Sequence, residues 1–494
     1  MGIFRTKPIE DVLAQGGAKE SSTTLRKRLG VLDLVGLGVG VVIGTGIFTL
    51  TGVEAKTHAG PAVVLSFVLA GVISMLAAMC YAELASAVPT AGSAYSYAYA
   101  TIGEVVAWII GWDLLLEFVL GASVVSRGWS GYLQNLFGLP TAIFGEQSVV
   151  NVGAIVIVAV LGTVAAIGVK ESARVTNTLV VVKVAICLFV IVAGAFFVKK
   201  ANLTPFIPPS QPTTGGSGSG LERPVVQTFL GSPSSFGIAG ILTAAAVVFF
   251  AYTGFEAVAN MSEESRNPRR DMPRGLLWTL GVATALYLGV SFVLTGMSKY
   301  TELNEGSPLA SAFDAVGASW AGTLVSIAAV CGLSSVILVD LVGIGRIGFA
   351  MGRDGLLPPT VAKVHPRFGT PLRFTVGATI IVMVVGGLIP LTTLADLVSI
   401  GALFAFTLVS IAVPVLRHTR PNLDRPFRVP LSPVLPIVSA LACIYLMLNL
   451  SIATWLRFAV WFLLGIAVYA FYGRRHARLS PSQTSRDEPT HSSA

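Results

Sequence analysis

Twelve runs of apolar residues, each long enough to cross a lipid bilayer, divide most of this chain between them. A helix that spans the hydrocarbon core needs about 20 predominantly apolar residues. Only 12% of the 494 residues are charged and 54% are hydrophobic, whereas soluble domains carry roughly 25% charge. The sequence therefore predicts an all-α polytopic membrane protein, with runs at 31–57, 61–86, 105–133, 149–169, 175–198, 236–262, 275–297, 319–352, 373–390, 392–416, 433–450 and 453–473.

The distribution of Lys and Arg predicts how these runs are oriented. If the N-terminus lies inside, 24 of the 33 Lys and Arg residues fall in inside segments and six in outside segments. Such a bias is what the positive-inside rule expects. We therefore expect a multi-pass protein of the plasma (inner) membrane with residues 1–30 and a disordered tail, 474–494, in the cytoplasm. Residues 199–235 form an extracellular loop with a Gly/Ser run, Thr213–Gly220. Orientation explains the net charge of +8, so no nucleic-acid partner is expected.

The cysteine and histidine positions argue against an enzyme. All four cysteines lie in apolar runs without CxxC spacing, and all five histidines lie outside the runs or at their ends. The chain has neither a GxSxG nucleophile motif nor a GxxxxGK[ST] phosphate loop. No filter repeat of the kind that a channel requires is visible. We expect a carrier with no metal, no cofactor and no enzymatic activity.

The first run contains an unusual concentration of glycine. Five of the eleven residues from Gly36 to Gly46 are glycine, and each costs about 1 kcal/mol against alanine in a helix interior. We expect Gly36, Gly38 and Gly40 to allow close helix packing, and the helix to break at Gly44-Thr45-Gly46. Unpaired backbone at membrane depth is tolerated only where it lines a cavity or binds something.

A second interruption lies in the sixth run, five runs after the first. Gly254 and Glu256 break an otherwise apolar segment about two-thirds of the way along it. Interrupted helices at matching places in two halves of a chain indicate a transporter built from an inverted repeat. The spacing predicts repeats at 31–198 and 236–416, with two further helices within 433–473.

Four segments of the chain have sequences that one transporter family shares: Gly38–Phe48; Phe249–Glu256 with Glu263–Pro273; Tyr81–Leu84 with Pro89–Tyr95; and Arg346–Pro358. In these segments the chain resembles the amino acid–polyamine–organocation superfamily. Within the family, Gly111–Asp113 through Trp129–Tyr132 is similar to the cationic amino acid transporter branch, bacterial members included. The resemblance implies a LeuT-type 5+5 inverted repeat with helices 1 and 6 broken, and secondary active transport by alternating access.

The two breaks offer partners for a free α-amino acid. Its carboxylate and ammonium are both costly to desolvate without partners. A helix that restarts after a break presents N–H groups and a positive dipole end to the carboxylate, and glycine at 44 and 46 lets the backbone approach it. The predicted contacts are the amides of Thr45, Gly46 and Ile47 for the carboxylate, and the carbonyls near Ile43 and of Phe250, Ala251 and Thr253 for the ammonium.

Two side chains are candidates for reading the rest of the substrate. A carboxylate at the depth of Glu117 costs about 3 kcal/mol by insertion scales, and the resemblance implies that it faces the substrate side chain. A negative charge there favours arginine, lysine or ornithine; a broad or neutral amino acid carrier, or a polyamine carrier, is the alternative. Asp113, one turn earlier, is expected to be structural, although either carboxyl group can instead pair with Arg127 or be protonated. The resemblance implies an aromatic gate at Phe255, with plain packing as the alternative.

Lys183 lies eight residues into the fifth run, about 12 Å from its inner end. Its stem reaches only part of that distance, so snorkelling would be strained. The alternative is an ammonium bonded to backbone carbonyls of the first run near Gly38 or Val39. The resemblance implies proton coupling at this lysine; a purely structural tether is the other interpretation. The expected partners are thus an L-amino acid, H+ and the bilayer.

Overall fold

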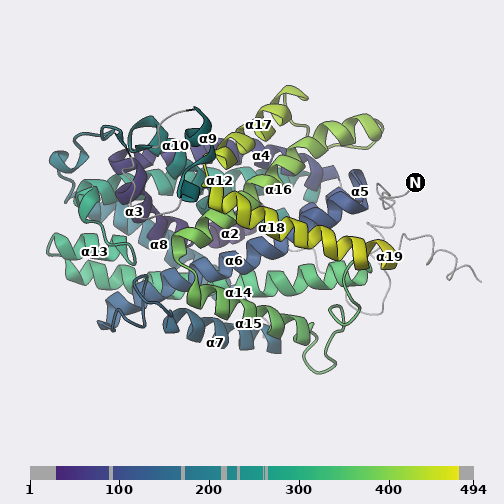
Figure 1. Ribbon diagram of the computed structural model, residues 1–494, viewed down its shortest axis with the longest axis horizontal. Coiled ribbons are helices and arrows are strands. Elements are labelled where there is room, and N and C mark those ends of the chain that lie inside the picture. The colour runs from purple at the N-terminus through teal and green to yellow at the C-terminus, as the bar shows by residue number, and fades with distance from the viewer. Residues whose placement is uncertain are drawn as a thin grey trace, which may run out of the picture.

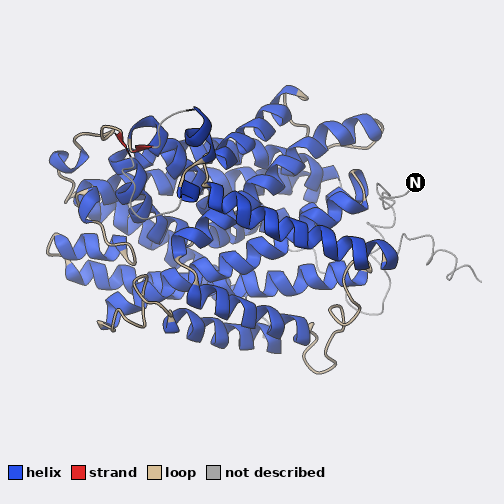
Figure 2. Ribbon diagram, in the orientation of Figure 1, coloured by secondary structure: helices blue, strands red, loops and turns tan. Residues whose placement is uncertain are grey.

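The computed structural model describes residues 29–87, 93–168, 173–212, 220–230, 234–259, 261 and 265–477. The predictions for the N-terminal segment, for most of the Gly/Ser run and for the tail beyond Ala477 lie outside these residues. The helices are joined by loops, and the described residues contain one antiparallel pair of two-residue strands, β1 (Gln211–Pro212) and β2 (Ser234–Ser235) (Figures 1 and 2).

The long helices form the centre of the fold. In Figure 1, α14 runs along the longest axis, with α3 and α13 at one end and α5 and α19 at the other. Helix α6 packs against α14 and α16, and α12 packs against α4 and α2. The bounds are α2 (Val31–Val42), α4 (Val63–Ala87), α6 (Glu104–Phe137), α12 (Pro268–Met297), α14 (Ser319–Arg353) and α16 (Leu391–Thr419).

Shorter helices complete the bundle and its two ends. The α-helices are α3 (Thr51–Glu54), α5 (Ser93–Thr101), α7 (Val152–Ile167), α8 (Ala173–Ala195), α9 (Val225–Leu230), α10 (Gly237–Val248), α11 (Glu256–Ala259), α13 (Pro308–Ala315), α15 (Leu372–Leu388), α17 (Val434–Leu448), α18 (Ile452–Val468) and α19 (Arg474–His476). The 3₁₀ and π turns are η1 (Gly46–Leu50), η2 (Ala55–Ala59), η3 (Gly60–Ala62), η4 (Lys200–Leu203), η5 (Gly220–Glu222), η6 (Phe249–Tyr252), η8 (Tyr300–Glu302) and η9 (Tyr469–Gly473).

Each of the twelve predicted ranges contains a helix. Eight helical segments of the described chain are long and apolar enough to span a membrane, and four apolar helices, α2, α7, α15 and α17, are shorter. The first two ranges are joined by one tight turn, in which Gly60 has a φ of +60° that glycine adopts readily. The sequence predicts a disordered tail from residue 474, but the first residues of that tail form helix α19, which follows directly after η9.

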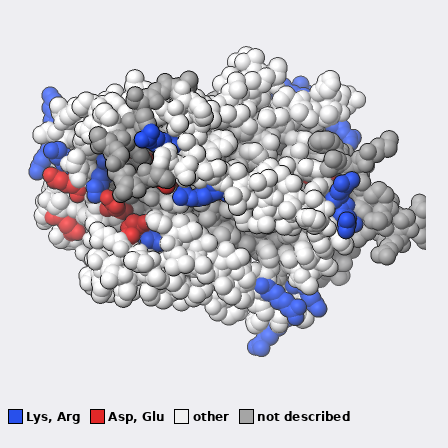
Figure 3. Space-filling view, in the orientation of Figure 1, with Lys and Arg blue, Asp and Glu red and all other residues white. Residues whose placement is uncertain are grey.

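The outer surface of the bundle is apolar over a wide area. Large hydrophobic side chains with more than half of their surface exposed occur on several helices, for example Val72, Val160, Val181 and Val460. In Figure 3, most charged side chains lie toward the two ends of the long axis. So large an exposed apolar surface is expected of a protein that contacts lipid.

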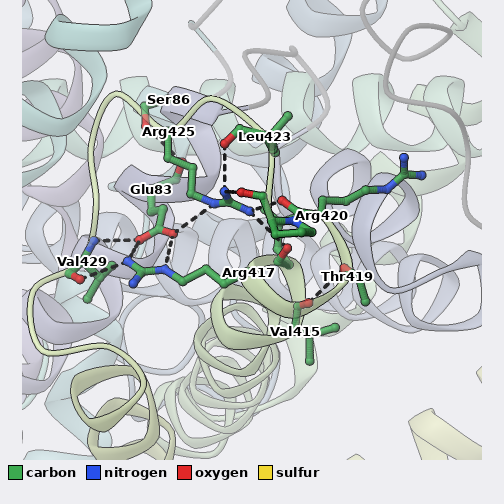
Figure 4. Close-up of polar contacts among 11 residues, drawn as sticks. Glu83, Ser86, Val415, Arg417, Thr419, Arg420, Leu423, Arg425 and Val429 are labelled. Atoms are coloured by element: carbon green, nitrogen blue, oxygen red, sulfur yellow. Dashed lines mark hydrogen bonds and ion pairs between the residues drawn. The ribbon is translucent and has the colours of Figure 1, made fainter.

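One buried carboxylate, Glu83, joins α4 to the end of α16 and to the loop that follows it (Figure 4). Its two oxygens accept from the Arg417 guanidinium at 2.9 and 2.6 Å, and Oε2 also accepts from the Val429 amide at 2.7 Å. The Arg425 guanidinium lies 3.8 Å away. Burial lowers the pKa of Arg425, while the carboxylate of Glu83 acts in the opposite direction. This network fixes the end of α16 against α4.

Alanine in place of Glu83 should therefore destabilise the fold. Removal of one partner of a buried ion pair costs about 3 kcal/mol or more, and the Val429 amide would also lose its acceptor. We expect a clearly lower unfolding temperature of the detergent-solubilised protein. The matched control is Asp424→Asn, which breaks the exposed pair with Arg269 and should leave that temperature unchanged. Equal unfolding temperatures for both variants would contradict the role of Glu83.

Candidate functional site

The first helix is interrupted close to where the sequence predicts. Helix α2 ends at Val42, Ile43 has extended backbone with ψ of 97°, and η1 begins at Gly46. The Ile43 amide still donates to Val39 O at 2.9 Å, and the Phe48 amide donates to Gly44 O. The break thus begins one residue earlier than expected, because the backbone leaves the helical region at Ile43.

The second interruption separates η6 from α11. Thr253 is extended, and Gly254 has a φ of +98°, a conformation that favours glycine. The Gly254 amide donates to both carboxylate oxygens of Glu256, at 2.9 and 3.0 Å, so the first residue of α11 holds the backbone of the break. A Cβ on Gly254 would lie 2.8 Å from Cγ1 of Val41 in the first helix.

The two breaks meet backbone to backbone. A Cβ on Gly46 would collide with Cβ and Cα of Ala251 in η6. The Tyr287 hydroxyl of α12 lies 2.7 Å from Val42 O and 2.8 Å from Ala251 O, so it bridges carbonyls of both breaks. Sequence analysis missed Tyr287. Its only signal is that a tyrosine deep in an apolar run needs a hydrogen-bond partner.

A cavity lies at this junction and brings most of the predicted site residues together. Its lining includes seven of them: Gly44, Thr45, Gly46, Glu117, Phe250, Ala251 and Thr253. It is completed by Val41, Val42, Phe118, Gly121, Val125, Gly254, Glu256, Val336, Asp340 and Val398. The predicted contacts Ile43 and Ile47 are fully buried beside it and do not line it.

Phe255 also lies outside the cavity lining. Its ring packs against Tyr81 and Phe406, with centroid distances of 5.5 and 5.1 Å, and it has no exposed surface. In this structure it packs as an ordinary core aromatic residue, which is the alternative that the sequence left open. A gating role would require this ring to move.

Three carboxyl groups line the cavity, and sequence analysis selected only one of them as a substrate contact. Glu117 is 6% exposed and its Oε2 has no hydrogen-bond partner among the described residues. Glu256 was recognised only as an interruption, and Asp340 of α14 was missed. Asp340 interrupts the otherwise apolar segment Ile337–Val342. The rule that selects Glu117, a carboxylate at mid-membrane depth, would also have selected Asp340.

Arg127 does not pair with either of its predicted candidates. Its Nε donates to Glu146 at 2.9 Å and its Nη1 donates to Gly386 O at 3.2 Å. An ion pair of Arg127 with Asp113 or Glu117 is therefore excluded in this structure. Asp113 is 2% exposed, does not line the cavity, and has no hydrogen-bond partner for either oxygen among the described residues.

Lys183 of α8 is buried with only 1% of its surface exposed, so its side chain does not snorkel. Its Nζ donates to Gly40 O at 2.6 Å, one residue beyond the predicted acceptors. Gly40 packs closely against Val180 and Gly38 against Thr279 and Val258, as expected of packing glycines. Gly36 differs, because no atom lies within 4 Å of the position of its Cβ. The packing role expected of Gly36 is therefore wrong.

Paired helix breaks around a buried polar cavity are typical of secondary transporters. Comparison with protein families agrees: residues 29–471 match the amino acid permease model. The chain belongs to this family, within the amino acid–polyamine–organocation superfamily. It is a multi-pass membrane transporter and not an enzyme.

The relatives differ in the substrates for which they are named. The chain is 44% identical to the methylthioribose transporter of Bacillus subtilis, with 97% of this chain and 99% of that protein covered. It is 41% identical to a branched-chain amino acid permease of the same organism, again over 97% and 99%. The cationic amino acid transporter 3 of Arabidopsis thaliana is 32% identical over 97% of this chain and 95% of that protein. These names include both neutral and cationic substrates.

Proposed function

We propose that this protein is a secondary active transporter of amino acids that binds its substrate in the cavity between the two helix breaks. The observation that carries the proposal is the cavity itself, which is lined by Gly44–Gly46 on one side and by residues of η6 and the second break on the other. The half-helices that end and begin at the two breaks would present opposite partial charges to this space.

The substrate's α-carboxylate would bind the amides of Thr45 and Gly46, at the start of the resumed helix; the third predicted contact, Ile47, lies behind this lining. Its ammonium would bind carbonyls of η6 and the second break. Phe250 O already accepts from the Thr253 amide and hydroxyl, and Ala251 O from Tyr287. Each carbonyl oxygen has two lone pairs, so an ammonium would share these acceptors with the protein, most readily at Ala251.

The charge of the cavity supports a cationic substrate such as arginine, lysine or ornithine. Glu117, Glu256 and Asp340 line it, and Lys183, the buried lysine of the described residues, interacts with Asp340 alone of the three. The second candidate is a carrier of neutral or broad specificity. The relatives named for branched-chain amino acids and methylthioribose favour it, since they are more similar to this chain than the cationic transporter described above.

The proposed architecture has twelve membrane-spanning helices, with inverted repeats at 31–198 and 236–416 and two further helices in 433–473. Transport would proceed by alternating access, with the bundle that contains the two breaks rocking against the third, fourth, eighth and ninth apolar runs. We place the protein in the inner membrane with both termini cytoplasmic. In Figure 3, Lys and Arg alone are visible at the end that carries α19, whereas both signs of charge occur at the other end, which supports this orientation.

Proton coupling is proposed at Lys183. Its ammonium bonds to Gly40 O, in the half-helix that leads to the first break. Loss of the proton would weaken this bond and release α2 from α8, so protonation and movement of the first helix would be linked.

A competition panel in proteoliposomes tests the proposed substrate class. Uptake of labelled arginine should be inhibited strongly by lysine, weakly by alanine and not by putrescine, which lacks a carboxylate for the Gly46 region. Stronger competition by leucine than by lysine would favour the neutral carrier, and competition by putrescine alone would point to a polyamine carrier.

Glutamine in place of Glu117 should weaken arginine uptake by about tenfold or more and alanine uptake far less, because only arginine has a side-chain cation to pair with it. The measurement is the Michaelis constant for each substrate in the variant and in the parent protein. An equal loss for arginine and alanine would show that Glu117 does not contact the substrate side chain.

A further inference from the structure

Asp340 occupies a position in the cavity that faces Glu117 from another helix. It belongs to α14, is 8% exposed, and lines the cavity together with Glu117 and Gly121 of α6. Gly121 is one helical turn beyond Glu117 and so lies on the same face of α6. A Cβ on Gly121 would be 3.2 Å from Asp340 Oδ2. The absence of a side chain at 121 therefore makes room for the Asp340 carboxyl group against α6.

More acidic than basic groups surround Asp340 and its neighbour Glu117. Asp340 interacts electrostatically with Glu256 and with the ammonium of Lys183, and Glu117 interacts with Glu256, Asp113 and Asp340. Tyr81 is a further titratable neighbour of Glu117 and Glu256. Only Asp340 among these four carboxyl groups interacts with the Lys183 ammonium. Three of them, Glu117, Glu256 and Asp340, line the cavity, so a cation that entered it would meet carboxyl oxygens from three helices.

Two buried polar atoms of residues that line the cavity are available to a ligand. Thr45 Oγ1 and Glu117 Oε2 are buried, belong to residues that line the cavity, and have no hydrogen-bond partner among the described residues. Buried polar atoms normally have partners. Thr45 comes from the first break and Glu117 from α6, so a ligand that bonds both would extend from the break toward the carboxyl groups.

We propose that Asp340 determines the charge selectivity of transport, by binding the distal cationic group of the substrate side chain together with Glu117. A guanidinium group suits such a site, because its planar donors can bond two carboxylates at once. This inference rests on the proposed function. It adds Asp340, a residue of the eighth apolar run that the positions of the two helix breaks do not identify.

The alternative role for Asp340 is that of a counter-ion to Lys183. Asp340 interacts with Lys183, so it can serve as a counter-ion that only stabilises the buried ammonium. In that case its loss would impair transport of every substrate to the same degree, since Lys183 serves them all. A selectivity residue affects cationic substrates alone.

The test compares arginine with alanine in proteoliposomes for Asp340→Asn. The arginine-to-alanine ratio of kcat/KM should fall at least about tenfold, while alanine transport stays within about twofold of the parent. The matched control is Asp354→Asn, a buried carboxyl at the end of the same helix that does not line the cavity, and it should keep the parental ratio. Equal losses for arginine and alanine, or an unchanged ratio, would overturn the assignment.

A second variant keeps the test informative if Asp340→Asn does not fold. Gly121→Ala leaves every charge in place but pushes its Cβ against Asp340 Oδ2, so it should lower the same ratio in the same direction by a smaller factor. Stabilisation of the purified protein by arginine and by alanine, measured as the shift in unfolding temperature, reports binding without transport. A parental preference for arginine in Gly121→Ala by both measurements would contradict the inference. Failure of the parent protein to transport any amino acid would instead refute the proposed function.

Discussion

Alanine in place of Gly46 is expected to lower amino acid uptake by about 100-fold or more, although it adds only one methyl group. That methyl would overlap Cβ and Cα of Ala251, and the Ala251 amide would lie 3.2 Å away. Backbone atoms cannot rotate aside as a long side chain can, so the two breaks must move apart. Separation would open the junction that Tyr287 bridges and displace the amides proposed to bind the carboxylate.

The matched control lies in the same glycine-rich segment. Gly36 has no atom within 4 Å of the position of its Cβ, and alanine is the better helix former. Gly36→Ala should therefore transport like the parent. Uptake is measured in proteoliposomes that contain equal amounts of each purified variant. Normal uptake by Gly46→Ala would show that substrate transport does not depend on the close approach of the two breaks.

Methionine in place of Lys183 is expected to remove the response of uptake to a proton gradient. The substitution keeps a long apolar side chain against Gly332 but removes the ammonium that donates to Gly40 O at 2.6 Å. The orphaned carbonyl costs about 1–3 kcal/mol, and no proton can be carried at this position. Uptake in parental proteoliposomes should rise with an imposed inward proton gradient, and uptake by the variant should stay at the level without a gradient.

An exposed lysine beyond the end of the same helix gives the control for this charge change. Lys199→Met removes an ammonium outside the bundle and should leave the gradient response intact. A parental protein whose uptake ignores the gradient would exclude proton coupling. A Lys183→Met variant that still responds would place the coupling group elsewhere.

Much of the fold could be predicted because the bilayer restricts the length and the composition of the helices that cross it. The lengths of the apolar runs predicted the long helices α6 and α14, which have 34 and 35 residues. The two helix breaks were predictable because glycine is costly in a helix, and Gly254 indeed needs its positive φ. These features depend on local sequence, and local rules suffice to find them.

The partners of buried charges were not predictable in the same way. Arg127 pairs with Glu146 and not with a carboxyl group of its own helix, and Glu83 pairs with Arg417, 334 positions away. Gly36 and Gly40 lie one helical turn apart in the same apolar run. A Cβ on Gly40 would contact Val180, whereas no atom lies within 4 Å of a Cβ on Gly36. Each of these facts depends on which helices the folded chain places side by side.

The central claim is that substrate binds at the junction of two broken helices in a carrier that alternates its access. Counterflow tests it most directly: proteoliposomes preloaded with unlabelled arginine are diluted into trace labelled arginine, for the parent, Gly36→Ala and Gly46→Ala. The account predicts transient accumulation of label by the parent and by Gly36→Ala, and none by Gly46→Ala. Label that only equilibrates in the parent, without stimulation by internal arginine, would contradict it, and so would full counterflow by Gly46→Ala.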